Sequence, residues 1–319
     1  MFHFLRLIRP LNLLIIAFTM YMMRYFVVGG KWMDWQGNET SDLFCFTMTH
    51  FDFFLLVIST MSVAGAGYII NDYFDIRIDR INKPEKVIVG KYIKKRVAML
   101  WHTLLNFFAI GIAVYLTFKY YNFWPLIFHL STTLGLWMYS LSLKRQFLSG
   151  NLTISLMAGM VVLLSGLADL PDMMLRYQEV PEGYPFTLEQ LSFSWKAIWV
   201  FTGFAFLTTL IREVQKDLAD VKGDEAQKCK TVPIVWGIPK TKKLVIALVV
   251  LLLVPLFLIV FSLQLELYRL IFISFAVIVP ILYSGFLTSS TNDRNGFLGA
   301  AKWMKFAMFA GVLYSLFLF

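Results

Sequence analysis

Three aspartates and one asparagine stand at helical intervals in the segment from Asn71 to Asp79. If the helix that precedes them continues through the segment, Asp72, Asp75 and Asp79 follow i, i+3 and i+7 and lie on one face. Carboxylate and amide oxygens are hard ligands that suit Mg²⁺, which commonly bridges protein carboxylates and substrate phosphates. The segment therefore predicts a magnesium site that also faces an anionic substrate.

A second acidic face is expected in the segment from Arg212 to Asp224. Glu213, Asp217, Asp220 and Asp224 follow i, i+4, i+7 and i+11, again on one side of a helix. Like charges stacked in this way destabilise a helix by roughly 0.2–0.5 kcal/mol per pair. Two such faces in one chain indicate that cations bind between them.

Basic residues beside both segments are available to neutralise phosphate oxygens. They are Arg77, Arg80, Lys83, Arg212, Lys216 and Lys222. The alternative is that both segments are solvated, charge-balanced loops without a catalytic role. Because two acid clusters in helical register each end an apolar stretch, the metal-site interpretation is favoured over that alternative.

The composition places these segments in a membrane protein. Hydrophobic residues make up 58% of the 319 residues and charged residues 15%, against about 45–50% and about 25% in soluble domains. Nine apolar stretches of about 18–23 residues are long enough to cross ~30 Å of hydrocarbon as helices. They lie near residues 10–29, 52–71, 97–117, 122–142, 152–170, 195–212, 243–263, 267–287 and 298–318. We therefore expect an all-α membrane protein with nine transmembrane helices in a bundle.

The distribution of basic residues predicts which helix ends face the cytoplasm. With the N-terminus inside, most of the 29 Lys and Arg residues fall at inner helix ends and loops, as the positive-inside rule requires. The exceptions are Arg24, Lys31, Lys119, Arg176, Lys196 and Arg269. We expect the N-terminus and both acidic segments on the cytoplasmic face and the C-terminus on the opposite side. The net charge of +9 then belongs to a membrane surface, which removes the argument for a nucleic-acid partner.

The two acidic segments also indicate an internal repeat. Each follows an even-numbered apolar stretch, and four helices separate them. We expect one domain over residues 1–319, built from two four-helix halves at roughly 1–145 and 146–290 and a last helix at 298–318. Cys45 and Cys229 fit no metal or disulfide spacing and are expected to behave as small buried hydrophobic residues.

At the acidic segments the sequence resembles the UbiA superfamily of intramembrane prenyltransferases. The first segment matches the family pattern N-D-x-x-D-x-x-x-D in full, and Asp217, Asp220 and Asp224 match D-x-x-D-x-x-x-D. The chain also reads R-P-L-N from Arg9 and Y-S-L-S-L-K from Tyr139, with Gly-Asn following at 150–151, and both segments are similar to family segments. Together with the expected nine spans, the resemblance covers essentially the whole chain.

The resemblance implies a bundle around a central cavity, with two Mg²⁺ ions at its cytoplasmic mouth. These ions would hold the diphosphate of an isoprenyl donor, whose tail would lie in an apolar tunnel open to lipid. The implied metal ligands are Asn71, Asp72, Asp75, Asp217, Asp220 and Asp224, and the five aspartates among them would be catalytic. The implied substrate or diphosphate contacts are Asn12, Asn71, Asp79, Arg80, Lys83, Tyr139, Lys144, Arg212, Glu213 and Lys216.

Several of these residues also have a plain structural interpretation. A lysine such as Lys144 at a helix end is commonly a snorkelling anchor, and a tyrosine such as Tyr139 commonly belongs to the aromatic belt. Glu213 could pair with a neighbouring base instead of supporting a metal. Asn12, inside an apolar stretch, needs a hydrogen-bond partner that a neighbouring helix could supply.

The segment from Arg212 to Asp224, followed by K-T-V-P at 230–233, is most similar to the digeranylgeranylglyceryl phosphate synthase branch of the family. That branch transfers a geranylgeranyl group to a glycerol-phosphate prenyl ether. After N-K-P at 82–84 the branch continues with an arginine–proline-rich turn, whereas this chain reads E-K-V-I-V-G at 85–90. The departure concerns a turn that would contact the acceptor.

Two alternatives to a glycerophosphate acceptor remain at this point. The motif pair also fits prenylation of an aromatic acceptor, as in quinone, haem or chlorophyll pathways. A transporter of an anionic lipid or metabolite is the alternative from another class, because intramembrane acids and a repeat would suit one. Transporter sites lie near the bilayer midplane, whereas these acids gather at one face beside basic loops, so prenyl transfer is favoured.

Overall fold

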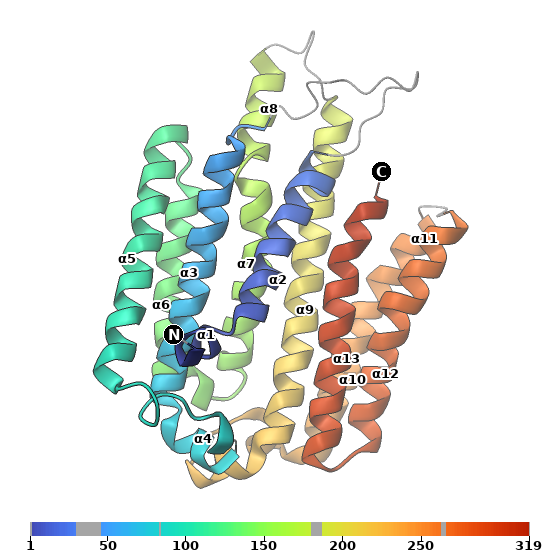
Figure 1. Ribbon diagram of the computed structural model, residues 1–319. Helices are drawn as coiled ribbons and strands as arrows, with labels where there is room; N and C mark the ends of the chain where they lie inside the picture. Colours follow the sequence, from blue (N-terminus) through green and yellow to red (C-terminus); the bar gives the residue numbers. More distant parts are fainter. Residues whose placement is uncertain (1, 30–45, 83, 180–186, 263–265, 319) are drawn as a thin grey trace.

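The computed structural model describes residues 2–29, 46–82, 84–179, 187–262 and 266–318. Within these ranges the regular secondary structure is helical, and Val89 and Ile93 form only an isolated bridge. The predicted all-α class is confirmed. The helices stand side by side in one elongated bundle, with α4 near one end and α8 at the other (Figure 1).

From the N-terminus the helices are α1 (Phe2–Ile8), α2 (Pro10–Met22) with a π-helical continuation (Met23–Val28), α3 (His50–Phe74), α4 (Ile76–Asn82), α5 (Lys95–Tyr120), α6 (Trp124–Leu141), α7 (Ser149–Leu167) and α8 (Leu170–Glu179). They are followed by α9 (Leu188–Ala226), α10 (Val232–Ser262), α11 (Leu267–Phe272), a π-helical segment (Ile273–Ile278), α12 (Val279–Ser290) and α13 (Arg294–Leu313). Short 3₁₀ turns lie at Pro84–Lys86, Leu143–Arg145 and Tyr314–Phe317.

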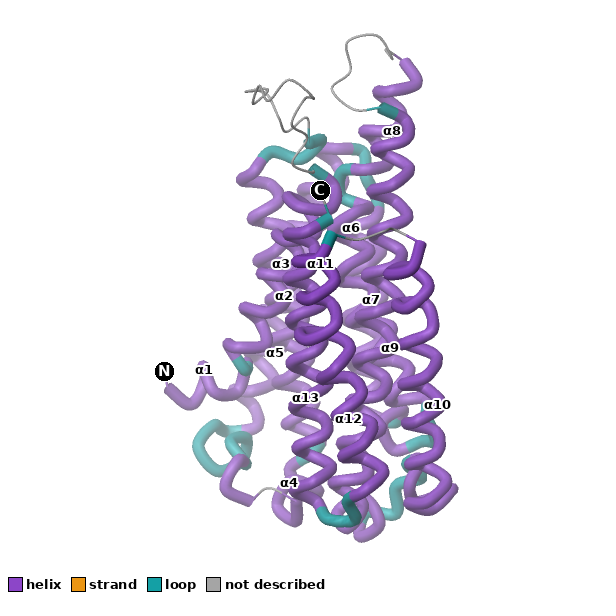
Figure 2. Tube along the Cα trace, turned by 90° about the vertical axis from the view of Figure 1, so that its right-hand side faces the viewer, coloured by secondary structure: helices purple, strands orange, loops and turns teal. Residues whose placement is uncertain are grey.

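The helix boundaries follow from capping residues in the sequence. Thr49 caps α3, Thr187 and Gln190 form a capping box at α9, and Asp293 caps α13, each satisfying backbone N–H groups that a helix start leaves free. Gly237, with a φ of 77°, interrupts α10 just before Pro239. α1 leaves the bundle sideways near the end that carries α4 (Figure 2).

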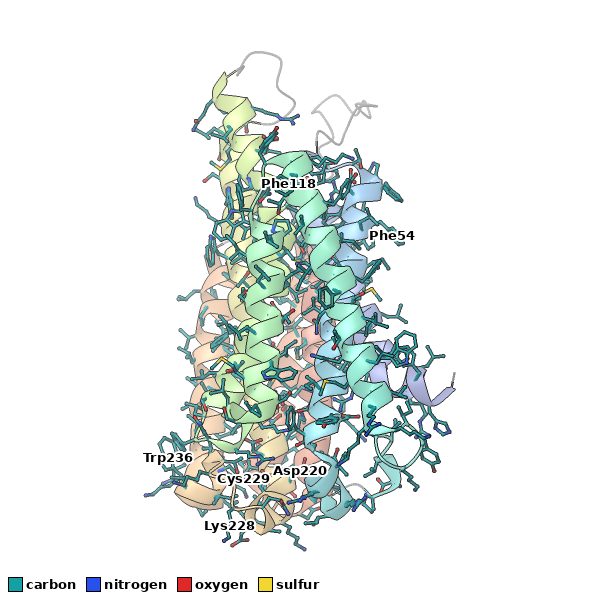
Figure 3. The ribbon with its side chains drawn as sticks, turned by 90° about the vertical axis from the view of Figure 1, so that its left-hand side faces the viewer. Phe54, Phe118, Asp220, Lys228, Cys229 and Trp236 are labelled. Atoms are coloured by element: carbon teal, nitrogen blue, oxygen red, sulfur yellow. The ribbon has the colours of Figure 1, made fainter. Side chains whose placement is uncertain are left out.

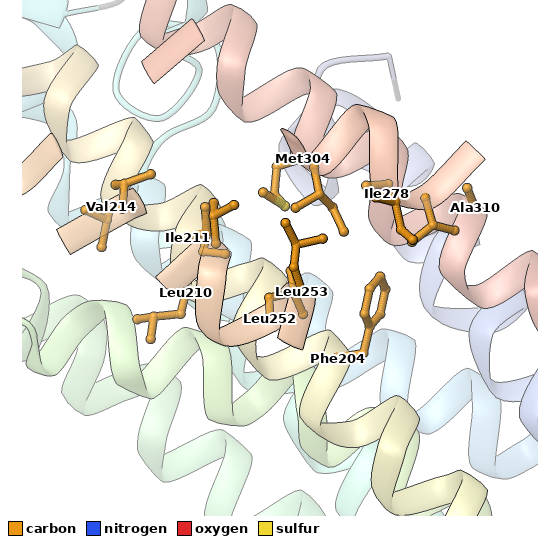
Figure 4. Packing of buried hydrophobic residues seen from close by; sticks show 14 of the residues in the cluster. Phe204, Leu210, Ile211, Val214, Leu252, Leu253, Ile278, Met304 and Ala310 are labelled. Carbon is orange, nitrogen blue, oxygen red and sulfur yellow. The ribbon is translucent and has the colours of Figure 1, made fainter. Parts of the chain in front are cut away.

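α9 is the central helix for the site, because it packs against α7, α10 and α13 and also meets α4. Its apolar face contributes Ile211 and Val214 to a buried cluster that Leu253 of α10 and Met304 of α13 complete (Figure 4). Between helices in a membrane, such side chains stabilise the bundle by close van der Waals packing rather than by removal from water. This packing holds α9 in place over the length that carries the second acidic segment.

Seven helical segments in the described part of the chain are long and apolar enough to cross a membrane: Pro10–Val28, His50–Phe74, Lys95–Tyr120, Ser149–Gln178, Leu188–Ala226, Val232–Phe261 and Leu267–Ser290. The predicted count of nine is not confirmed. α6 and α13 are helical where spans were expected, but α6 contains His129 among Ser and Thr residues, and α13 contains Lys302 and Lys305.

The outer surface of the bundle is apolar in a way that suits lipid. Phe54 and Phe118 project from it, with 45% and 73% of their surface exposed (Figure 3). Similar large apolar side chains are exposed on α5, α6, α10 and α12. Water-soluble monomers rarely expose apolar patches of this extent, so the surface agrees with an integral membrane protein.

Candidate active site

The first acidic segment lies at the end of α3, and basic residues from two other parts of the chain bind it. Asp72 Oδ1 accepts a hydrogen bond from Arg9 Nη2 at 2.6 Å. Lys144, in the turn after α6, forms an ion pair with Asp75 and donates to Asn71 Oδ1 at 3.3 Å. Lys144 is 9% exposed, so it is an inward-facing ion-pair partner rather than a snorkelling anchor.

The assumption of one continuous helix through Asp79 is wrong. α3 ends at Phe74, Asp75 takes φ −87° and ψ 0°, and a separate helix, α4, begins at Ile76. The chain turns here because α4 packs against α9 instead of extending beyond the bundle. Asp79 remains close enough to Arg9 for their charges to interact, whereas Arg80 is exposed.

The second acidic segment lies on α9, which runs unbroken to Ala226 as expected. Asp217 Oδ2 accepts a hydrogen bond from Asn151 Nδ2 of α7 at 2.8 Å. Asp220 Oδ1 lies 3.3 Å from Arg294 Nη2 at the start of α13. Two different neighbouring helices, α7 and α13, therefore hold these two carboxylates.

Glu213 pairs with bases of its own helix. Its two oxygens lie 2.8 Å from Arg212 Nη1 and 2.6 Å from Lys216 Nζ. Glu213 therefore pairs with neighbouring bases, which is the structural alternative to supporting a metal. Arg212 and Lys216 thus share the single negative charge of Glu213.

The two acidic segments face one another across the end of the bundle. Tyr139 of α6 is close enough to Asp75 and Asp217 for both charges to act on its hydroxyl. The Cys229 thiol lies in the turn after α9, at the lower end in Figure 3. Burial raises the pKa of this thiol, and the negative charges of Asp224 and Asp75 raise it further. Carboxylates of both segments therefore act on the same two side chains.

The exposure of the carboxylates suits contact with a substrate. The side chains of Asp72, Asp75 and Asp220 are 14%, 14% and 15% exposed, so each is shielded but reachable. Among the described residues no three His, Cys, Asp or Glu side chains already converge on one point as a metal site. Mg²⁺ usually takes one or two protein carboxylates and completes its shell with water and substrate phosphates. The oxygen donors present fit that mode of binding.

Asn12 finds its hydrogen-bond partner on a neighbouring helix, as its position inside an apolar stretch requires. Lys305 Nζ of α13 donates to Asn12 Oδ1 at 2.8 Å, and Tyr68 of α3 also hydrogen-bonds to Asn12. Lys83 lies outside the described residues, as does Cys45. Cys229 is a free, buried thiol, as predicted.

Four residues of this site were not predicted as site residues: Arg9, Asn151, Arg294 and Lys305. Arg9 and Asn151 stand in the R-P-L-N and Gly-Asn segments, so those segments carried a signal for them. Arg294 and Lys305 had none, because a basic residue at a helix end or on a helix face has many structural uses.

The unusual turn after the first segment is packed into the protein. Ile88 and Val89 are buried in a small cluster with Leu7 of α1 and Ile69 of α3, and Val87 beside them is also buried. Gly90 closes the turn with a φ of 82°, which favours glycine. The apolar residues that replace the arginine–proline turn thus attach it to the ends of α1 and α3.

Two apolar hollows in the described part of the chain lie away from the acids. One of about 470 Å³ lies between α3 and α5 and is lined by Phe51, Phe107 and Tyr115 among others. The other, of about 410 Å³, is bounded by residues such as Trp124 and Trp199. Neither is the central cavity that the resemblance implies, so that cavity stays a prediction.

Comparison with known proteins gives a consistent result. The model of the UbiA prenyltransferase family matches residues 11–317. Digeranylgeranylglyceryl phosphate synthase from Thermococcus sibiricus is 32% identical over 178 residues, which are 56% of this chain and 54% of that protein. The protein of the same name from Saccharolobus solfataricus is 34% identical over 220 residues, or 68% and 69% of the two chains. The chain thus spans about half the length of the first relative and about two thirds of the second.

The solved structures agree with the sequence relatives. A structure of digeranylgeranylglyceryl phosphate synthase matches with a TM-score of 0.66 at 21% identity, over 99% of this chain and 98% of that one. A UbiA homologue from Archaeoglobus fulgidus, bound to DMAPP and Mg²⁺, matches with a TM-score of 0.60 at 16% identity over 99% of each chain. At these identities the structures establish the fold. With paired acidic segments at one end of the bundle and a family match over nearly its full length, the chain belongs to the UbiA prenyltransferase family.

Proposed function

We propose that the protein is a Mg²⁺-dependent prenyltransferase that moves a geranylgeranyl group from its diphosphate to a prenylated glycerol phosphate. The observation that carries the proposal is the convergence of the two acidic segments, with Arg9 and Lys144 bound to carboxylates of the first one. Support also comes from the relatives named digeranylgeranylglyceryl phosphate synthase and from the homologue that binds DMAPP and Mg²⁺.

In this proposal each acidic segment holds one Mg²⁺ ion, so that two ions act together. Asn71, Asp72 and Asp75 would hold one ion, and Asp217, Asp220 and Asp224 the other. When bound, the ions neutralise the charge that develops on the departing diphosphate. Asp79 would act through Arg9 rather than as a direct ligand, because its charge interacts with that guanidinium.

The remaining side chains bind and orient the substrate. Lys144 and Arg9 each hold a motif carboxylate and have further N–H groups for phosphate oxygens. Asn151 fixes the orientation of Asp217 by donating to its Oδ2. Tyr139 lies between the two segments, where its ring would limit water at the allylic carbon. Exclusion of water protects a carbocation-like fragment from hydrolysis.

The same arrangement supports a particular orientation in the membrane. α4 and the start of α2, which carries Arg9 beside Asp72, lie near the end with the acids, and the C-terminus lies near the other end (Figure 1). With the basic loops inside, we propose that both acidic segments face the cytoplasm. We also propose that the bundle contains an internal repeat of two four-helix halves.

A panel assay of the purified protein tests the proposal. Isoprenyl diphosphates of C10 to C20 are crossed with glycerophosphate-type and aromatic acceptors, each with and without Mg²⁺. Mg²⁺-dependent transfer to the glycerophosphate acceptor, with geranylgeranyl diphosphate as the preferred donor, is expected. Transfer to aromatic acceptors alone would replace the proposed acceptor, and vesicle uptake without pyrophosphate release would identify a transporter.

A further inference from the structure

A layer of cationic and amide side chains lies deeper in the bundle than the aspartates, between α2, α9 and α13. Lys305 donates to Asn12 at 2.8 Å, and the positive charge of Arg212 is close enough to act on Lys305. Arg212 precedes Asp220 by eight residues, and Lys305 follows Arg294 by eleven. At 1.5 Å per residue these separations are about 12 Å and about 16 Å of helix from the Asp220–Arg294 pair.

The charge of Lys305 is not balanced within the described part of the chain. Its hydrogen-bond partner is the neutral amide of Asn12, and the ionic group that acts on it is another cation, Arg212. Glu213, the adjacent carboxylate, already binds Arg212 at 2.8 Å and Lys216 at 2.6 Å. A half-buried ammonium inside a membrane bundle is costly and marks a ligand or ion pathway by default. The missing partner is an anion.

We propose that Lys305, together with Arg212 and Asn12, binds the phosphate of the acceptor lipid. This inference rests on the proposed function, because it requires an acceptor that carries a phosphate monoester. Arg212 and Asp217 are five residues apart, about 7.5 Å along α9. In a glycerol phosphate the hydroxyl sits on the carbon next to the phosphate ester. A phosphate held by the deeper layer would therefore direct that hydroxyl toward the donor diphosphate at the aspartates.

The arrangement divides two phosphate groups between two sets of residues. The carboxylates would hold the metal ions that neutralise the donor diphosphate, whereas the N–H donors of the deeper layer would bind the acceptor phosphate directly. The planar guanidinium of Arg212 can donate two parallel hydrogen bonds, and the ammonium of Lys305 acts as a point charge. The two groups therefore bind phosphate oxygens in complementary ways. An acceptor without this phosphate would leave Lys305 uncompensated, so the layer would select for phosphorylated acceptors.

Lys305→Met tests the inference, because methionine keeps the length of the side chain and removes the charge. Steady-state KM values for geranylgeranyl diphosphate and geranylgeranylglyceryl phosphate are measured with Mg²⁺. Loss of a charge-assisted hydrogen bond is expected to raise the acceptor KM about 10- to 100-fold, with the donor KM changed less than about twofold. Lys305→Arg should restore most of the acceptor affinity. Lys302→Met, an exposed lysine of the same helix, is the matched control and should behave as wild type.

A second measurement does not depend on turnover. Without donor, geranylgeranylglyceryl phosphate should raise the Tm of the wild type more than its dephosphorylated alcohol does, and Lys305→Met should lose this difference. If Lys305→Met does not fold, Lys305→Gln takes its place in both measurements. A raised donor KM would assign the layer to the donor diphosphate and overturn the inference, as would unchanged KM values. Wild-type transfer to aromatic acceptors alone would instead overturn the proposed function.

Discussion

Four aspartates of the two acidic segments each bind a side chain from a distant part of the chain. Asp72 binds Arg9, Asp75 binds Lys144, and Asp220 binds Arg294. Asp217 differs, because its partner is the neutral amide of Asn151. These partners hold the side chains in one orientation before a substrate arrives, which is the arrangement that efficient sites require.

Asp220→Ala tests the catalytic role of the second segment. We expect kcat/KM for the donor to fall by roughly 100-fold or more, the size seen when one group that stabilises transition-state charge is removed. The Tm should barely change, because a partly exposed ion pair such as Asp220–Arg294 contributes only about 0–1 kcal/mol. Activity and Tm are measured on the same detergent preparation.

Asp172→Ala is the matched control, since Asp172 also pairs with an arginine, Arg176 at 2.7 Å, but near the opposite end of the bundle. It should retain wild-type kinetics. Near-normal activity in Asp220→Ala would remove Asp220 from the metal site.

At the scale of elements, the turn between α6 and α7 positions Lys144. A Cβ atom on Gly150 would lie 2.6 Å from the Cα of Lys144 and 3.1 Å from the carbonyl oxygen of Leu143. Both neighbours are backbone atoms, which cannot move away as a flexible side chain can. Gly150 therefore permits the close approach that brings Lys144 to Asp75.

Gly150→Ala should for this reason reduce both stability and activity. Overpacking of this kind costs about 1–3 kcal/mol, and the displaced turn would move Lys144 away from Asp75. The Tm and the donor KM report the two effects. Gly203→Ala in α9, where the added Cβ has no atom within 4 Å, should be neutral or slightly stabilising. Equal behaviour of the two alanine variants would show that the turn does not need glycine.

Asp293 caps the start of α13, and the stability that this cap contributes depends on pH. Hydrogen bonds from the Thr291 hydroxyl and the Gly296 N–H lower the pKa of Asp293. A pKa lowered by folding means that the cap stabilises fully above the unfolded value of about 3.9 and less as the pH falls through the folded value. Asp293→Ala should lower the Tm at pH 7, and its difference from the wild type should shrink toward pH 3. A difference that grows on acidification would contradict this sign.

At the scale of the whole molecule, the ion pairs at the two ends of the bundle differ in how far they are buried. The end with the acidic segments keeps its ion pairs shielded but reachable. Toward the other end, Arg24 and Asp169 form a pair at 3.0 Å with both side chains fully buried. The guanidinium lies 4.2 Å from the ring centres of both Phe46 and Phe53. A fully buried pair suits a structural link between the π-helical continuation of α2 and the junction of α7 and α8, and it leaves no route to a substrate.

Arg24→Met should therefore act on stability and not on chemistry. Removal of one partner of a buried ion pair costs about 3–5 kcal/mol, because the other charge stays unpaired. The double variant Arg24→Met with Asp169→Leu should recover much of this loss. Tm values measure the effect, and kcat per folded molecule should stay at the wild-type level. A double variant no more stable than the single one would exclude a pairwise interaction.

The all-α membrane class, the family and the two acidic segments can be recognised in the sequence alone. Long apolar stretches leave few alternatives to helices in lipid, and the spacing of Asp217, Asp220 and Asp224 on α9 held because nothing interrupts that helix. The break at Asp75 could not be predicted, since it depends on the packing of α4 against α9. Hydropathy alone also assigned α6 and α13 as spans, although both carry polar residues.

Only the tertiary structure decided which polar residues meet. Arg9 is 63 residues from Asp72, and Arg294 is 74 residues from Asp220. Lys305 is 293 residues from Asn12. Local spacing carries no information about such pairs, because the packing of helices, and not the order of the chain, sets which side chains share a layer. The proposed acceptor site is the clearest case: Asn12 and Arg212 stand in segments that the sequence singled out, but Lys305 does not, and only the packing of the bundle brings Lys305 to Asn12.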